Sequence, residues 1–207
     1  KNKGVCWCEY DYASWCAIGL LYIVEYADWD SQSKIGKGNT TSSSAINSGG
    51  TDSMVYHTGR ASGTDGVTAV QYRHIENPWG NVHEWIDGVN FSDGTVYVCN
   101  DHSKFADDTN TNYTSIGTKV QSDGWITKIG YSSTASWSFY PTSLGGSETA
   151  YIPDHAGYNS GWRVLSVGGG RDYGSSSGMF CFRATYNSTG SDSYIGARLL
   201  FIPPDEL

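Results

Sequence analysis

Apolar residues recur at helical spacing in one long segment near the amino end of the chain. Between Ala13 and Trp29 the sequence reads ASWCAIGLLYIVEYADW, in which Trp15, Ile18, Leu21, Tyr22 and Tyr26 recur at helical spacing. This spacing predicts an α-helix that packs one face against a core. The segment that follows, residues 30–53, is rich in Gly, Ser, Thr and Asn. It is too polar to order itself, so we expect a loop that lies on the surface or is held by its neighbours.

The pattern changes to short apolar runs separated by turn signals after Val67. The run FSDGTVYV, residues 91–98, carries an Asp-Gly turn between two apolar stretches and predicts a β-hairpin. Further short segments of the same kind are GWITKIGY (124–131), WSFYPTSL (137–144) and TAYIPD (149–154). The chain is therefore predicted to be rich in short strands.

Two apolar segments near the carboxyl end enclose a polar, irregular run. GWRV (161–164) and IGARLLFIP (195–203) are predicted to be core strands, whereas the residues between them are rich in Gly, Ser, Tyr and Asp. Side chains on such a run contribute little to stability when they point outward, so its sequence can vary without unfolding the protein. Phe180 and Phe182 are the exceptions, and we expect them to fill the core.

Composition narrows the class of protein. Only 16% of the 207 residues are charged, and 26 Gly stand against 5 Pro, which favours short strands and many turns over a helical bundle. A net charge of −8 argues against nucleic acid as a partner. No apolar stretch reaches the length of a membrane span, so no membrane insertion is expected. No linker or repeat divides the sequence, and we predict a single domain over residues 1–207.

The common motifs for metal, phosphate or nucleophilic chemistry are incomplete. The five cysteines, an odd number without a CxxC pair, are expected to be free thiols: Cys6, Cys8, Cys16, Cys99 and Cys181. VHEWID lacks the second His of a zinc-protease helix, and the Gly-rich runs lack the Lys of a phosphate loop. DDTNTNY has Tyr113 where a calcium loop needs Gly. We therefore predict no metal ion and no cofactor.

Three short motifs resemble a known branch of a fold. GNVHEW (80–85), GWRV and GARL (196–199) are similar in order and character to signatures of the formylglycine-generating-enzyme branch of the C-type-lectin fold. From about Leu20 to Pro203 the chain resembles, more closely, the variable proteins of diversity-generating retroelements of gut bacteria and their phages. The longer segments that carry this resemblance are LLYIVEYADWDSQSKIGKG (20–38), IENPWGNVHEWIDGVNF (75–91) and YVCNDHSKFADDT (97–109).

The resemblance implies an α+β protein with the C-type-lectin fold: short antiparallel strands, one or two helices and extensive loops. It also implies a variable ligand-binding region at about residues 162–198. In such systems, Asn codons that end in a pyrimidine are changed at their first two bases only, so they cannot come to encode Lys, Glu, Gln, Trp or Met. Between Arg163 and Ile195 the chain has no Lys, Glu, Gln or Trp and a single Met, Met179, which we interpret as a fixed scaffold position.

Tyr and Arg side chains dominate binding surfaces of this kind, and Ser, Gly, Asn and Asp add adaptable hydrogen bonds. The predicted contact residues are Leu165, Ser166, Gly169, Arg171, Asp172, Tyr173, Ser175, Ser177, Cys181, Arg183, Thr185, Tyr186, Ser188, Asp192 and Tyr194. Trp79, Trp85 and Trp162 are instead expected in the core. Glu84 and Arg198 are predicted to make a hydrogen-bonded structural contact, with backbone or with each other.

The leading hypothesis is therefore a binding protein, displayed on a phage tail or on a bacterial cell surface, that recognises a host-surface protein or a glycan. A homo-oligomer would raise weak site affinities through multivalency. One alternative is a fixed structural domain of a virion or cell surface. Another is an oxidoreductase of the formylglycine-generating type, although that chemistry needs a pair of cysteines and Cys181 stands alone in the last third of the chain.

Overall fold

The computed structural model describes residues 6–118 and 122–203, which form a mixed α+β structure made mostly of strands. The α-helices are α1 (Tyr12–Tyr26) and α2 (Ser31–Lys34), with short 3₁₀ turns at His102–Lys104 and Gly174–Ser176. The strands are β1 (Trp7–Glu9), β2 (Gly59–Arg60), β3 (Val70–Tyr72), β4 (Ile75–Glu76), β5 (His83–Ser92), β6 (Thr95–Val98), β7 (Thr114–Thr118), β8 (Asp123–Ser132), β9 (Ala135–Leu144), β10 (His155–Tyr158), β11 (Trp162–Val167), β12 (Phe182–Tyr186), β13 (Ile195–Gly196) and β14 (Leu199–Phe201).

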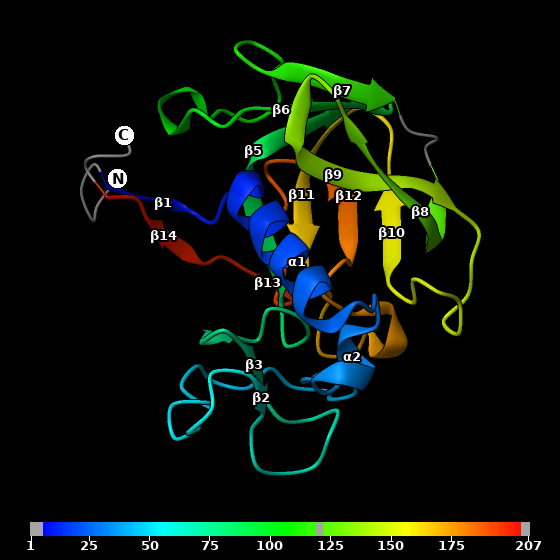
Figure 1. The fold of residues 1–207 in the computed structure, drawn as a ribbon. Coiled ribbons are helices and arrows are strands. Elements are labelled where there is room, and N and C mark those ends of the chain that lie inside the picture. The colour runs from blue at the N-terminus through cyan, green and yellow to red at the C-terminus, as the bar shows by residue number, and fades with distance from the viewer. Residues whose placement is uncertain (1–5, 119–121, 204–207) are drawn as a thin grey trace.

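A large sheet organises the molecule and curls toward a barrel. Its strand order is β7-β6-β5-β11-β12-β10-β8-β9, and β13 pairs with β5 beside this path. The two ends of the sheet approach each other, because the Tyr140 hydroxyl of β9 donates to the Ile116 carbonyl of β7 at 2.9 Å. Figure 1 shows the resulting curved layer, with β2, β3 and β4 forming a separate small sheet below it. The α+β class is confirmed.

The strands differ in two ways from the short antiparallel set that was predicted. Three of them, β5, β8 and β9, are ten residues long. Two pairs are parallel, β10 with β12 and β13 with β5. The predicted hairpin at residues 91–98 is confirmed, since Ser92 pairs with Thr95 across the Asp-Gly turn. Residues 149–154 form no strand, because β10 begins only at His155.

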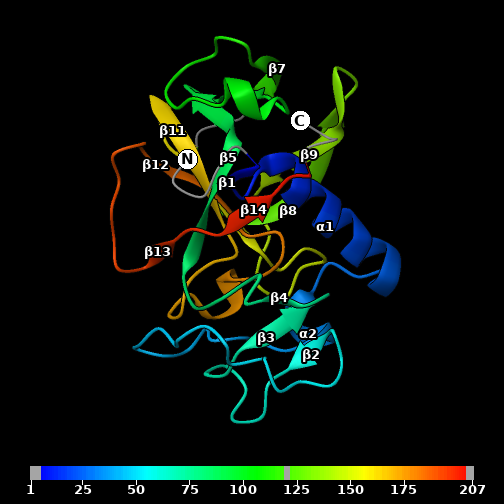
Figure 2. The same cartoon turned by 90° about the vertical axis from the view of Figure 1, so that its left-hand side faces the viewer.

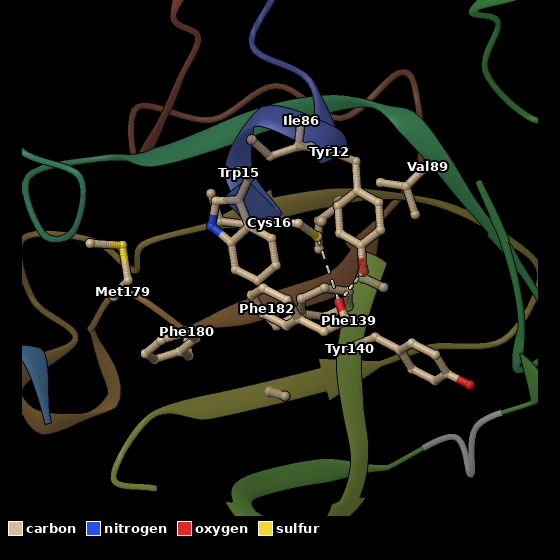
Figure 3. Packing of buried hydrophobic residues seen from close by; sticks show 14 of the residues in the cluster. Tyr12, Trp15, Cys16, Ile86, Val89, Phe139, Tyr140, Met179, Phe180 and Phe182 are labelled. Carbon is tan, nitrogen blue, oxygen red and sulfur yellow. Dashed lines mark hydrogen bonds between the residues drawn. The ribbon is translucent and has the colours of Figure 1, made fainter. Parts of the chain in front are cut away.

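Helix α1 supplies one side of the core. It begins after Asp11, whose side chain accepts from the Ser14 N–H at 2.7 Å, and it ends at Ala27, which adopts a left-handed conformation. Tyr12 and Trp15 pack on Phe182 of the central strand β12. Figure 3 shows these rings together with Phe139 and Phe180 in one cluster. The predicted helix and the core positions of Phe180 and Phe182 are thus confirmed.

The segment IGARLLFIP is not the core strand that was predicted. It forms two short strands, and β14 pairs only with β1 in a two-stranded sheet beside the main one (Figures 1 and 2). Leu199 and Phe201 are about half exposed, and Ile202 alone of the last four described apolar residues is buried. The other segment, GWRV, does open β11, a central strand whose Leu165 and Val167 are buried in the core.

The predicted contact between Glu84 and Arg198 is confirmed. The Arg198 Nε donates to the Glu84 carboxylate at 2.9 Å, and Nη2 reaches both this carboxylate and the Glu76 carbonyl. The pair therefore ties β5 to the segment between β13 and β14. Trp79 is fully buried as predicted, but Trp85 and Trp162 are only half buried, a correction to the prediction for both.

Candidate functional site

A row of directly paired residues crosses the face of the main sheet that points away from α1; we call this the outer face. On β12, Phe182 and Ala184 are buried while Arg183 and Thr185 point the other way, as the alternation of a strand requires. The register continues this outer row as Trp85, Ser166, Arg183, Gly157 and Asp123, from β5 to β8. Arg183 lies at its centre.

Tyr173 covers the centre of this row. Its ring contacts His83 edge-on, with centroids 4.6 Å apart, and the Arg183 guanidinium lies 5.6 Å from its centre. Burial, aided by Arg183, lowers the pKa of His83 to about 4, so this imidazole is neutral at pH 7. His83 Nδ1 and Arg183 Nε are both buried and accept or donate no hydrogen bond within residues 6–118 and 122–203. Tyr173 therefore lies over two buried polar groups that have no hydrogen-bond partner among the described residues.

Aromatic and acidic groups border the outer face near β5. Tyr186 packs edge-on against Trp85 at 5.6 Å, which extends the surface from Arg183 toward Ser188. The Ser188 hydroxyl donates to the Asp108 carboxylate. A pocket of about 140 Å³ opens beside them, lined by Glu9, Trp85, Ile86, Asp87, Asp107, Val164 and Ser188. A rigid aromatic surface next to hydrogen-bonding groups is typical of protein-binding faces.

The carboxylates of this pocket make stability depend on pH. Burial, then the nearby Asp87 and Asp107, raise the pKa of Glu9 to about 7. The folded state therefore keeps a proton on Glu9 that the unfolded chain has lost, and stability falls as pH rises from about 4.5 to 7. Burial raises the pKa of Asp87 and of Asp107 as well, which adds to the fall.

We expect Glu9→Gln to reduce this loss of stability, because the amide has no proton to release. Urea unfolding at pH 5 and pH 7.5 measures it. Glu148→Gln, the same change at an exposed glutamate in the loop between β9 and β10, should leave the fall in place. An equal fall in wild type and Glu9→Gln would contradict the assignment.

The loop that carries Tyr173 is held by residues outside it. Gln32 Nε2 donates to the Gly174 and Ser177 carbonyls at 2.9 and 2.7 Å, and the Ser31 hydroxyl accepts from the Met179 N–H at 3.0 Å. Gln32 and Ser31 belong to residues 30–53, the segment predicted to be a loop. The structure places them in α2, and through these contacts the segment and the loop that carries Tyr173 hold each other in place. Such anchoring lowers the ordering cost of binding.

Arg171 also acts as an anchor rather than as a free contact. It is 9% exposed, stacks on Tyr194 at 4.1 Å, and donates to the carbonyls of Ser43 and Ser193. Its own N–H and carbonyl bond to Asn81 and Ser42. It therefore ties the Tyr173 loop to the segment 42–43 and to the segment before β13.

The fifteen predicted contact residues divide by burial. Nine are exposed or half buried: Asp172, Tyr173, Ser175, Arg183, Thr185, Tyr186, Ser188, Asp192 and Tyr194. Six are buried in this structure, so their predicted role as contacts stays a prediction: Leu165, Ser166, Gly169, Arg171, Ser177 and Cys181. Gly169 shows why, since it has φ +76° and an added Cβ would lie 2.3 Å from the Ser177 hydroxyl. The exposed candidate surface is thus smaller than the predicted variable region, residues 162–198.

Sequence reasoning missed the part of the face that β8 and β10 supply. Asp123 bonds to Arg183 and to His155, and the Trp125 ring packs edge-on against His155 at 5.3 Å. No motif marks these residues. The two-residue period of a strand could have placed Trp125 and Ile126 of GWITKIGY on opposite faces, but it could not have placed Trp125 in the face that includes β12.

Clusters of metal-ligating side chains and reactive thiols are two further features that could give a face chemical activity. Within the described ranges, no three His, Cys, Asp or Glu side chains converge in a way that could hold a metal ion. All five cysteines are free, and burial raises the thiol pKa of Cys181, which makes it a poor nucleophile. Neither helix in the described part of the chain is long and apolar enough to cross a membrane.

Comparison with known proteins adds no family. No protein-family model matches the sequence, and no curated protein matches it. The resemblance to retroelement variable proteins and the C-type-lectin fold therefore stay predictions, and the outer face itself supports the proposed function.

Proposed function

We propose that this chain is a ligand-binding display protein, diversified by a retroelement, that recognises a host-surface protein or a glycan through its outer face. The proposed setting is the receptor-binding part of a phage tail or a bacterial cell surface, and the proposed fold is that of C-type lectins. No catalytic step, metal ion or cofactor is part of the proposal.

The observation that carries this proposal is the alternation on β12. Phe182 and Ala184 hold the strand in the core, while Arg183 and Thr185 face outward and Arg183 lies beside Tyr173. Tyr186 follows a shift in register and packs against Trp85 of the outer face. Replacing outward residues of such a strand leaves the buried contacts in place. A set of outward Tyr and Arg side chains on a fixed sheet is the composition expected of a variable binding surface.

The alternatives explain less of this arrangement. An oxidoreductase of the formylglycine-generating type requires two accessible cysteines, whereas Cys181 is fully buried. A fixed structural domain would accommodate the same fold, but it gives no reason for the absence of Lys, Glu, Gln and Trp between Arg163 and Ile195. It predicts one invariant sequence in the source population.

Sequencing the 3′ end of the gene across its source population tests the proposal. We expect adenine-specific differences at codons of outward residues such as Tyr173, Thr185 and Tyr186, together with a nearby DNA copy of the segment that encodes residues 162–198. Codons of buried residues such as Phe182 and Met179 should not vary. A uniform segment without such a copy would overturn the proposal and favour the fixed structural domain.

A further inference from the structure

Arg183 is held by two residues that lie outside the variable region. Its Nη1 lies 3.2 Å from Asp123 Oδ2 and 3.3 Å from His155 Nδ1. His155 Nε2 in turn lies 3.1 Å from Asp123 Oδ1. The three side chains therefore form a closed ring of contacts over β12, β10 and β8.

Gly157 makes this ring possible. It pairs with Arg183 on one side and with Asp123 on the other, so it lies beneath their contact. An added Cβ would lie 2.8 Å from Asp123 Oδ2 and 3.3 Å from Arg183 Cζ. A side chain at position 157 would push the Asp123 carboxylate and the Arg183 guanidinium apart. Arg183 can therefore reach Asp123 across β10 only because residue 157 is glycine.

The protonation state of His155 follows from the same geometry. Nε2 faces a carboxylate and must donate, whereas Nδ1 faces an arginine N–H and must accept. A neutral imidazole with its proton on Nε2 satisfies both contacts. Burial lowers the pKa of His155, with Arg183 acting in the same direction and Asp123 against it, and this favours the neutral form.

One side of the guanidinium remains available. Arg183 Nη2 donates to no residue in the described part of the chain, and the side chain is 16% exposed beside the half-exposed Asp123. Arginine side chains lose entropy when a partner immobilises them, so an arginine that is already fixed binds with less loss. Its planar N–H groups fit a carboxylate or carbonyl oxygen.

We propose that Asp123 is a positioning residue of the outer face, and that with His155 it fixes Arg183 so that Nη2 meets a carboxylate or carbonyl oxygen of a protein partner. The inference rests on the proposed function. Asp123 belongs to the constant scaffold and is 54% exposed, so water solvates it when another residue replaces Arg183. The scaffold can therefore fix an arginine in some sequence variants without a large cost in the others.

A measurement without any ligand tests the positioning itself. In nitrogen-15 NMR spectra, we expect slow rotation about the Arg183 Cζ–Nε bond in the wild type and in Asp52→Asn, an exposed control, and rapid rotation in Asp123→Asn. Urea unfolding should differ by no more than about 0.5 kcal/mol, because Asp123 is exposed. Rapid rotation of Arg183 in the wild type would overturn the inference.

The pH dependence of Arg183 rotation is a second measurement. It would show no transition linked to His155 if Asp123 and His155 had only a structural role. The groups that face His155 are Asp123, Arg183 and the Trp125 ring. Below pH 6.5, His155 binds a proton at Nδ1. The Nδ1–H then faces the N–H donor of Arg183, so the hydrogen bond between the two side chains is lost. Rotation of Arg183 should then become rapid, whereas His155→Gln should remove this transition. A transition that persists in His155→Gln would count against the proposed ring.

Binding is tested with a displayed library in which Tyr173, Thr185, Tyr186 and Ser188 are randomised and Arg183 is kept, selected against hen egg-white lysozyme as the probe. In the selected binders, Asp123→Asn should weaken affinity about tenfold, mostly through faster dissociation, and Asp52→Asn should not. Binders that tolerate Asp123→Asn would overturn the inference while the proposed function stands. A library that yields no binders, although Arg183 is fixed in the NMR spectra, would overturn the proposed function and this use of Arg183 with it.

Discussion

Replacing Trp79 by alanine is expected to lower the free energy of unfolding by about 3–5 kcal/mol. Trp79 is fully buried, and its Nε1 donates to the Gly36 carbonyl at 3.1 Å. The backbone approaches it closely on two sides, since an added Cβ at Gly38 or Gly168 would lie 3.1–3.2 Å from its main-chain atoms. Few atoms can move to fill the cavity, so the cost should lie at the upper end of this range.

Urea unfolding of the variant measures the loss. Trp7→Ala is the matched control, because Trp7 is 37% exposed on β1 and its loss should be clearly smaller. If Trp79→Ala does not fold, Trp79→Phe keeps a smaller aromatic ring in place and removes the hydrogen bond, with an expected loss of about 1–3 kcal/mol. Equal losses at Trp79 and Trp7 would show that Trp79 does not hold the core.

The elements that sequence alone predicted are those with a local signal. The helical spacing of apolar residues gave α1 within three residues at either end, and Asp-Gly gave the hairpin of β5 and β6. The apolar segments of β8 and β9 were likewise evident. In each case the deciding residues lie within a few positions of one another.

The errors come from residues whose environment is set by distant strands. IGARLLFIP is apolar enough for a core strand, but β14 finds only β1 as a partner, and Leu199 and Phe201 stay half exposed. Trp85 was assigned to the core from its size, yet it alternates with Ile86 and lies on the outer face beside Tyr186. Composition cannot distinguish the two faces of a central strand.

The candidate site was predicted as a stretch of sequence rather than as a surface. The polar run between GWRV and IGARLLFIP contains strand β12. Along this strand buried side chains alternate with side chains that face outward. Asp123 and His155 join the face only because β10 pairs parallel to β12 and antiparallel to β8. Such register is a property of long-range pairing, which one sequence without relatives does not reveal.

Gly178→Ala is expected to be strongly destabilising because of a contact with the buried Asp154. An added Cβ would lie 2.0 Å from Asp154 Oδ1, well inside the closest approach that such atoms allow. Asp154 cannot simply turn away: it is 1% exposed, and its Oδ2 accepts from the Phe180 N–H at 2.6 Å. Overpacking together with loss of that hydrogen bond should cost about 3 kcal/mol.

A double-mutant cycle identifies the cause. Asp154→Ala alone should cost about 1–3 kcal/mol, because it leaves the Phe180 N–H buried without a partner. Adding Gly178→Ala to that variant should cost little more, because the group it would strike is gone, which gives a coupling energy of about 3 kcal/mol. Gly124→Ala is the control, since its added Cβ meets nothing closer than 3.8 Å. Additive losses in the double variant would mean that the cost of Gly178→Ala does not come from a clash with Asp154.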